Sequence, residues 1–112
     1  MYVKKKFIPL LIENQNDMTK ADLVRKIAEK TGFDKKDVQK IVELYMDEIR
    51  NALEKGENVY LRGFGSFITK YRAEKVARNI KKNTSITVPA HYIPAFKPSK
   101  SFVENVKKNL KP

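Results

Sequence analysis

Apolar residues recur at helical spacing in the segment that follows Thr19. The Thr19 hydroxyl can accept a first-turn N–H, and Asp22 stands three residues later, a pattern typical of a capping box. Gly32 predicts the end of this helix. Its apolar positions are Leu23, Val24, Ile27 and Ala28. The pattern therefore predicts an amphipathic helix from about Thr19 to Gly32.

A second, longer apolar stripe follows at spacings of three and four residues. Asp34 is a candidate N-cap for this helix, and Gly56 predicts its end. The stripe consists of Val38, Ile41, Val42, Tyr45, Met46, Ile49 and Leu53. Because only residues 31–34 connect the two helices, we expect an antiparallel helical hairpin.

Beyond Gly56 the pattern changes to the alternation that is typical of strands. We predict strands at Glu57–Leu61, Ser66–Lys75 and Ser85–Tyr92, with a glycine-containing hairpin loop at Arg62–Gly65 and a connection at residues 77–83. Pro89 cannot donate to a strand ladder, so it should lie at an edge or a bulge. Lys70 and Arg72 should share one face of their strand.

Residues 94–98 lead to Ser99, a plausible N-cap for a closing helix that continues through Leu110. Phe102, Val103, Val106 and Leu110 form its apolar stripe. The predicted order is α-α-β-β-β-α. This is an α+β fold with a helical hairpin, a three-stranded antiparallel sheet and a C-terminal helix, from which the last two strands project as a β-ribbon, called the arm, at about residues 70–87.

Charge is distributed unevenly over these elements. The chain carries a net charge of +11, and residues 62–100 hold nine Lys/Arg against the single acid Glu74. Residues 18–61 hold nine Lys/Arg and nine Asp/Glu, so this part of the chain has no net charge. A basic ribbon on a neutral body indicates a nucleic-acid-binding protein.

Length and composition limit the remaining possibilities. A chain of 112 residues whose arm projects keeps only a small core, which favours dimerisation. The absence of cysteine gives no reason to place the protein in an oxidising compartment, so an intracellular setting is expected. The apolar run Phe7–Ile12 is too short for a secretory signal or a membrane span. Residues 1–17 are therefore expected to be a tail, either an added strand or a flexible extension.

Four short motifs carry a resemblance to the bacterial histone-like family of HU and integration host factor, over residues 18 to about 108. They are Lys30-Thr31-Gly32, Gly63-Phe64-Gly65-Ser66-Phe67, Arg78-Asn79 and Pro94-Ala95-Phe96-Lys97. The resemblance implies an intertwined dimer, with Phe64, Phe67 and Phe96 in the dimer core. It also implies two arms that reach into the minor groove of duplex DNA, bending and compacting it with little sequence specificity.

The end of the arm departs from the family pattern. The family usually has proline after Arg-Asn and inserts that ring between base pairs, whereas this chain has Ile80. Branched apolar residues also serve as minor-groove wedges, so Ile80 is the predicted wedge, with Arg78 and Asn79 beside it. The usual glycine is absent as well, and Asn83 is a candidate for the left-handed conformation of the turn.

The predicted DNA contacts extend along the ribbon and onto the body. Lys70, Arg72, Lys75, Lys81 and Lys82 lack compensating acids and should meet phosphates. Lys97 and Lys100 flank the start of the last helix, where an external anion is favoured. Lys20 and Arg62 either extend this surface or are ordinary surface charges.

Other functions remain as alternatives to non-specific bending. The chain could be a site-specific bender of the integration host factor type, or a scaffold that holds RNA or an acidic protein without bending DNA. A homodimer is expected, and a heterodimer with a paralogue is the other possibility. His91 is the single histidine, and no nucleophile, phosphate loop or metal-ligand set accompanies it, so no enzyme activity, cofactor, metal or small-molecule substrate is predicted. The predicted location is the bacterial cytoplasm, at the nucleoid.

Overall fold

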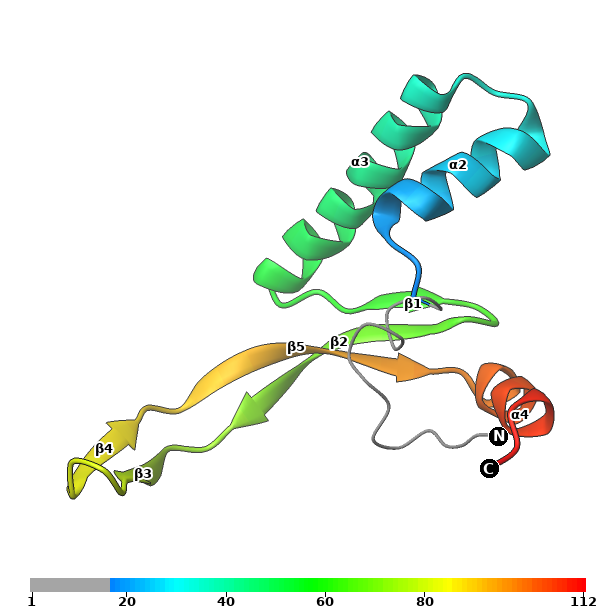
Figure 1. Cartoon of the computed structure of the whole chain (residues 1–112). Coiled ribbons are helices and arrows are strands. Elements are labelled where there is room, and N and C mark those ends of the chain that lie inside the picture. The colour runs from blue at the N-terminus through cyan, green and yellow to red at the C-terminus, as the bar shows by residue number, and fades with distance from the viewer. Residues whose placement is uncertain (1–16) are drawn as a thin grey trace. The chain divides into compact units, whose positions relative to one another are not determined.

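A computed structural model describes residues 17–112 of the chain (Figure 1). The predicted extension at residues 1–17 therefore lies, apart from Asp17, outside the described residues. The elements are α2 (Lys20–Thr31), α3 (Lys35–Glu54), β1 (Val59–Leu61), β2 (Gly65–Arg72), β3 (Lys75–Asn79), β4 (Thr84–Val88), β5 (His91–Pro98) and α4 (Lys100–Asn109). The chain divides within α3 into two compact units, the helical hairpin up to Glu48 and the sheets with α4 from Ile49 to Lys111.

Local hydrogen bonds set both ends of α2, as predicted. The Asp22 N–H donates to the Thr19 hydroxyl at 3.2 Å, and the Thr19 N–H donates to the Asp22 carboxylate at 3.0 Å. The hydrogen bond from the Thr19 backbone, followed by those from the Thr19 and Arg25 side chains, lowers the pKa of the Asp22 carboxyl. Gly32 takes the left-handed conformation at φ 78° and donates its N–H to the Ala28 carbonyl. The capping box is therefore confirmed.

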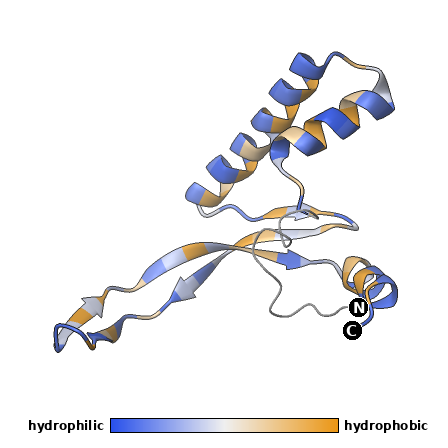
Figure 2. Cartoon of the chain, in the orientation of Figure 1, coloured by the Kyte–Doolittle hydropathy of each residue, from blue (hydrophilic) through white to orange (hydrophobic). Residues whose placement is uncertain are grey.

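The second helix begins and ends where the sequence predicts. The carbonyl of Asp34 accepts the Val38 N–H at 3.0 Å, and Gly56 adopts φ 82° after the last turn. Val24 and Val38 are the two hydrophobic side chains that are buried among the described residues, at 2% and 3% exposure. Polar and apolar residues occupy different sides of both helices (Figure 2). Much of the apolar surface of the hairpin consequently stays open in a single chain.

The ribbon differs from the prediction in its strand bounds, and residues 77–79, predicted as part of the connection, belong to β3. A three-stranded antiparallel sheet in the order β1-β2-β5 is followed by a separate two-stranded sheet, β3-β4, which forms the outer part of the arm (Figure 1). Each of the two long predicted strands is thus divided, at residues 73–74 and at residues 89–90. Pro89 lies in the second gap, where its missing N–H leaves no donor for the ladder. The predicted α+β fold with its arm is otherwise confirmed.

Residues 94–98, predicted as a lead into the last helix, instead belong to β5. Phe96 pairs with Phe67, and Pro94 pairs with Thr69. Pro94 and Pro98 are tolerated because β5 has a partner on one side only and is an edge strand.

A cluster of aromatic rings joins the sheet to α4. The Phe64 ring lies 5.1 Å from that of Phe96 and 5.4 Å from that of Phe102, and the Phe67 and Phe96 rings are 4.9 Å apart. The Ser99 N–H donates to the Phe64 carbonyl at 2.9 Å, while the Ser99 hydroxyl accepts the Phe102 N–H as the predicted N-cap of α4. The loop between β1 and β2 therefore fixes where α4 begins.

Replacing Gly65 with alanine should destabilise the protein. A Cβ there would meet the Lys97 carbonyl oxygen and the Phe96 ring, both at 2.6 Å. Forced overpacking of this kind typically costs about 1–3 kcal/mol. Gly56→Ala is the control. An added Cβ there would meet nothing within 4 Å, so its only cost is the backbone strain of an alanine at φ 82°. Urea unfolding at one fixed protein concentration should show the larger loss for Gly65→Ala, and an equal or smaller loss would contradict this packing.

Candidate nucleic-acid interface

Three predicted contact residues lie on one face of the three-stranded sheet. Lys70 and Arg72 alternate along β2 and therefore share a face, as predicted. Lys97 pairs with Ser66 on the neighbouring strand, which places it on the same face. All three side chains are exposed. This surface, the basic face, presents cations without an acidic residue among its strand positions.

The opposite face of the same strands is aromatic. Phe67 packs on Phe96, and further along the sheet the Tyr71 and Tyr92 rings lie 5.5 Å apart. Phe67, Phe96, Tyr71 and Tyr92 thus lie on the face opposite to that of Lys70, Arg72 and Lys97. Phe67 and Phe96 pack as structural residues on the side away from the predicted phosphate contacts.

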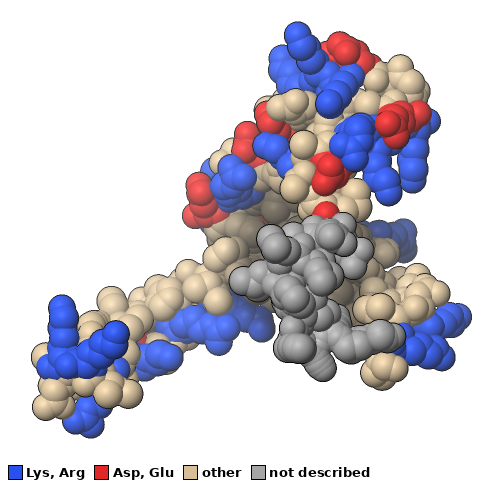
Figure 3. All heavy atoms as spheres, in the orientation of Figure 1, with Lys and Arg blue, Asp and Glu red and all other residues tan. Residues whose placement is uncertain are grey.

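Cations continue along the outer part of the arm. Lys75 and Arg78 point to opposite faces of the β3-β4 ribbon, because they are an odd number of positions apart in β3, and both are exposed. Lys81 and Lys82 follow at its end. In Figure 3, Lys and Arg gather along the arm, whereas Lys, Arg, Asp and Glu intermingle on the helical hairpin. Glu74, the acid of this stretch, lies in the gap between β2 and β3.

Four residues, Ile80–Asn83, connect β3 to β4 and are called the tip. Ile80 is 87% exposed, the largest fraction among the exposed large hydrophobic residues described. Asn83 adopts φ 53°, which confirms the predicted left-handed residue. A shallow hollow of about 470 Å³ lies beside the tip, lined by Ala77, Arg78, Asn79, Ile80, Lys81 and Ile86. The predicted wedge is therefore presented to solvent by a defined turn.

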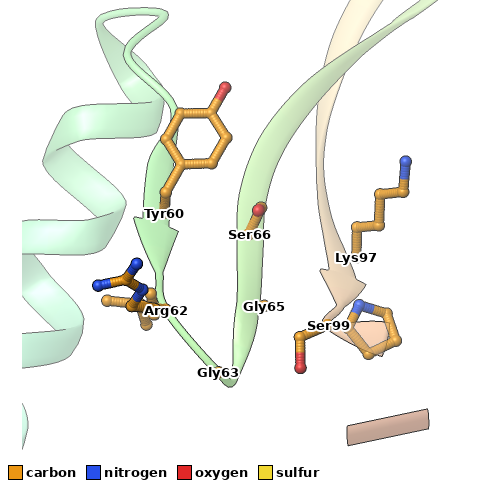
Figure 4. A pocket seen from close by; sticks show the side chains of 9 residues that line it. Tyr60, Arg62, Gly63, Gly65, Ser66, Lys97 and Ser99 are labelled. Carbon is orange, nitrogen blue, oxygen red and sulfur yellow. The ribbon is translucent and has the colours of Figure 1, made fainter. Parts of the chain in front are cut away.

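A second hollow, of about 410 Å³, lies at the loop between β1 and β2. Tyr60, Ser66 and Lys97 come from neighbouring strands at its rim, and Arg62 and Ser99 complete it (Figure 4). Tyr60 is 70% exposed and was missed by sequence reasoning. Its alternation with Val59 and Leu61 indicated an outward position, but only the pairing of Tyr60 with Ser66, and of Ser66 with Lys97, places it in one row across the three strands with Lys97.

The N-terminus of α4 borders this hollow. Lys100 is the first residue of α4, and the first turn of the helix contains no acidic residue. A helix N-terminus carries partial positive charge and usually attracts acids. Lysines at both sides of Ser99 therefore favour an anion from outside the chain, as a phosphate group would supply.

Lys20 has a partner within the helical hairpin. Its ammonium lies 3.0 Å from the Glu43 carboxylate, and both side chains are partly exposed. The hydrogen bond from Lys20, followed by that from Gln39, lowers the pKa of Glu43. Twenty-three residues separate the two partners, so local sequence patterns gave no signal of the pair. A DNA contact at Lys20 stays a prediction, and it would compete with this ion pair.

The described residues contain no group of three or more His, Asp and Glu placed to hold a metal ion. The His91 imidazole lies 2.8 Å from the Pro89 carbonyl oxygen, where Nδ1 acts as the donor, and so takes part in a local turn. Within residues 17–112, no helix has the length and hydropathy that a membrane span requires.

A cationic, acid-poor β-ribbon on an α+β body defines the class of nucleic-acid-binding proteins that use strands as their contact element. The family model described as bacterial DNA-binding protein matches residues 18–107, and the chain belongs to this family. The resemblance predicted from the four motifs is thereby confirmed.

Individual relatives agree with this assignment. The chain is 38% identical over 94 residues to integration host factor subunit beta of Saccharophagus degradans, covering 83% of this chain and 96% of the relative. It is 41% identical over 90 residues to DNA-binding protein HU of Geobacillus stearothermophilus, covering 80% and 100%. Among solved structures, an Anabaena HU–DNA cocrystal matches at a TM-score of 0.76 and 37% identity, covering 80% of this chain and 98% of that chain.

Removing the partner of Lys20 tests its predicted contact. Glu43→Gln should tighten duplex DNA binding by about two- to fivefold, because Lys20 no longer has to leave an ion pair. Glu48→Gln removes the same charge from α3 and serves as the control. Fluorescence anisotropy at several salt concentrations would measure both variants, and an equal gain for each would remove Lys20 from the interface.

Proposed function

We propose that this protein binds duplex DNA as a dimer and bends it by placing its arms in the minor groove. The single observation that carries the proposal is an acid-poor cationic arm that ends in an exposed isoleucine, Ile80. Family membership makes the chain an architectural DNA-binding and DNA-bending protein. The residues and steps assigned below are the proposal.

Phosphate contacts supply most of the affinity. Lys70, Arg72 and Lys97 of the basic face, with Lys75, Lys81 and Lys82 of the arm, neutralise backbone charges on either side of the bend. Lys100 and the first N–H groups of α4 hold a further phosphate near Arg62. Each neutralised phosphate releases counterions, so affinity must fall steeply as salt rises. These contacts carry no sequence information.

The tip converts binding into bending. Arg78 enters the minor groove, whose base edges distinguish A·T from G·C only poorly, so selection acts through the ease of deforming the DNA. Ile80 inserts between base pairs and partly unstacks them, as apolar wedges do in other minor-groove proteins. A branched aliphatic side chain retains the apolar bulk of the usual proline.

Dimerisation covers the apolar surfaces that one chain leaves open. A hollow of about 440 Å³ beside α4 is lined by Phe96, Pro98, Phe102, Val103, Val106 and Lys107. Val103 and Val106 are 42% and 47% exposed, and Phe64 is 47% exposed. Exposed apolar area of this kind mostly marks an interface. A second copy of the chain is the occupant that we propose, with Phe64, Phe67 and Phe96 at its centre.

The expected setting follows from the relatives, which are bacterial DNA-binding proteins. We place the chain on the bacterial nucleoid, within the cytoplasm. RNA has the same phosphate chemistry, so single-stranded RNA is included as a competitor in the test below.

Energy transfer between dyes at the two ends of a short duplex reads the bend directly. Wild type should raise the transfer at saturation, and more readily on nicked DNA because less stacking opposes the bend. Ile80→Ala should lower the saturating transfer while the dissociation constant changes by less than about threefold, as for other surface substitutions. Lys82→Ala is the converse control. It should reduce the slope of log affinity against log salt by about one phosphate contact and leave the saturating transfer unchanged.

Three outcomes would contradict the proposal. Equal loss of binding and bending in Ile80→Ala would remove the wedge. Binding by wild type without any rise in transfer would reduce the arm to an electrostatic clamp. Preference for single-stranded RNA over duplex DNA would turn the protein into an RNA-binding scaffold.

Assembly can be tested separately from DNA binding. Val106→Asp places a charge in the open hollow and should weaken the dimer in sedimentation equilibrium, with a melting temperature that falls on dilution. Val76→Asp adds the same charge to the arm, where Val76 is 68% exposed, and should leave assembly unchanged. A wild-type monomer at micromolar concentration with a concentration-independent melting temperature would overturn the dimer.

A further inference from the structure

The end of the arm contains a hydrogen-bonded turn that includes the predicted wedge, Ile80. Strand pairing continues to Asn79 and Thr84, which leaves the four residues of the tip to reverse the chain. The side-chain oxygen of Asn79 accepts the N–H of Lys81 at 3.1 Å and the N–H of Lys82 at 3.3 Å. One amide side chain therefore satisfies two backbone donors of the turn, in the manner of an Asx-turn.

Asn83 closes the same turn from the other side. It takes φ 53°, a conformation that asparagine tolerates better than most residues. Its side-chain oxygen lies 3.5 Å from the Arg78 guanidinium, which donates to it. This contact crosses the ribbon and keeps the Arg78 side chain beside the tip. Two asparagines thus take the place of the glycine usual in such turns.

Ile80 lies between Asn79 and Asn83 in the sequence. Its side chain is apolar and forms no hydrogen bond in the turn. Its 87% exposure leaves the side chain free to enter a base step. Asn79, in contrast, is only partly exposed, and its oxygen is already engaged. The side-chain oxygen of Asn79 is therefore engaged within its own chain, and the DNA contact predicted for Asn79 stays a prediction.

We infer that Asn79 is a positioning residue that fixes the tip in the free protein so that Ile80 is presented for insertion. Asn83 supports it by holding the left-handed backbone and Arg78. Because the turn is ordered before binding, no further conformational entropy is lost in ordering it on the DNA. More of the binding energy is therefore available to unstack the DNA. The inference rests on the proposed bending function, since it assigns the residue that orients the wedge.

The first part of the test uses the free protein and involves no DNA. Amide hydrogen exchange of Lys81 and Lys82, followed by NMR, should be accelerated by roughly tenfold in Asn79→Ala through loss of the shared acceptor. Asn79→Asp keeps an acceptor at the same place and should restore the wild-type rates. Asn109→Ala is the matched control, because it removes an asparagine whose amide bonds to the Asn105 carbonyl in α4.

The second part measures bending and binding of the same variants by end-to-end energy transfer. Asn79→Ala should lower the saturating transfer toward the value for Ile80→Ala, while the dissociation constant changes by less than about threefold. Asn79→Asp should recover the saturating transfer, although its charge weakens the affinity. This separation of bend from affinity, with rescue by aspartate, is not expected of a residue that merely stabilises the fold.

Two results would overturn the inference. Unchanged exchange at Lys81 and Lys82 in Asn79→Ala would show that the turn does not depend on this side chain. Loss of bending in both Asn79→Ala and Asn79→Asp, with normal exchange, would make Asn79 a direct DNA contact through its amide. Failure of wild type to bend DNA, with accelerated exchange in Asn79→Ala, would refute the proposed function and leave the turn intact.

Discussion

The close approach of Gly65 to Phe96 is the constraint on which the arrangement of the second unit depends. A backbone without a side chain at this position lets the Phe96 ring and the Lys97 carbonyl lie against β2. That approach aligns β5 with β2, and the alignment has two effects at once. It packs Phe96 against Phe67 on one face of the sheet, and it places Lys97 opposite Ser66 on the other face. Packing and electrostatics are therefore fixed by the same register.

The helices were predictable because their signals are local. Thr19, Asp22 and Gly32 act within one or two turns of the positions that they terminate, and the apolar spacing of α3 needs no knowledge of the rest of the chain. The strands were predicted less completely. A proline at position 89 interrupts its own strand, but the matching gap at residues 73–74 is visible only once the register of the two strands is known.

The same distinction applies to the interface. Alternation correctly placed Lys70 and Arg72 on one face, since that rule concerns neighbours in one strand. Tyr60 and the pairing of Lys20 with Glu43 depend on contacts between distant segments, so neither was foreseen. Asn79 shows an intermediate case. Its bonds are local, but asparagine can serve a turn or a base edge equally well, and the sequence alone does not distinguish the two uses.

The prolines of β5 also bear on how the protein behaves when many copies crowd together. An edge strand exposes unpaired N–H and C=O groups that can recruit a strand from another molecule. Pro94 and Pro98 remove donors from that edge, and the cation Lys97 lies between them. Such an edge is a poor template for intermolecular β-pairing and hence for aggregation. Copies of the chain that lie beside one another are therefore poor partners for strand exchange through this edge.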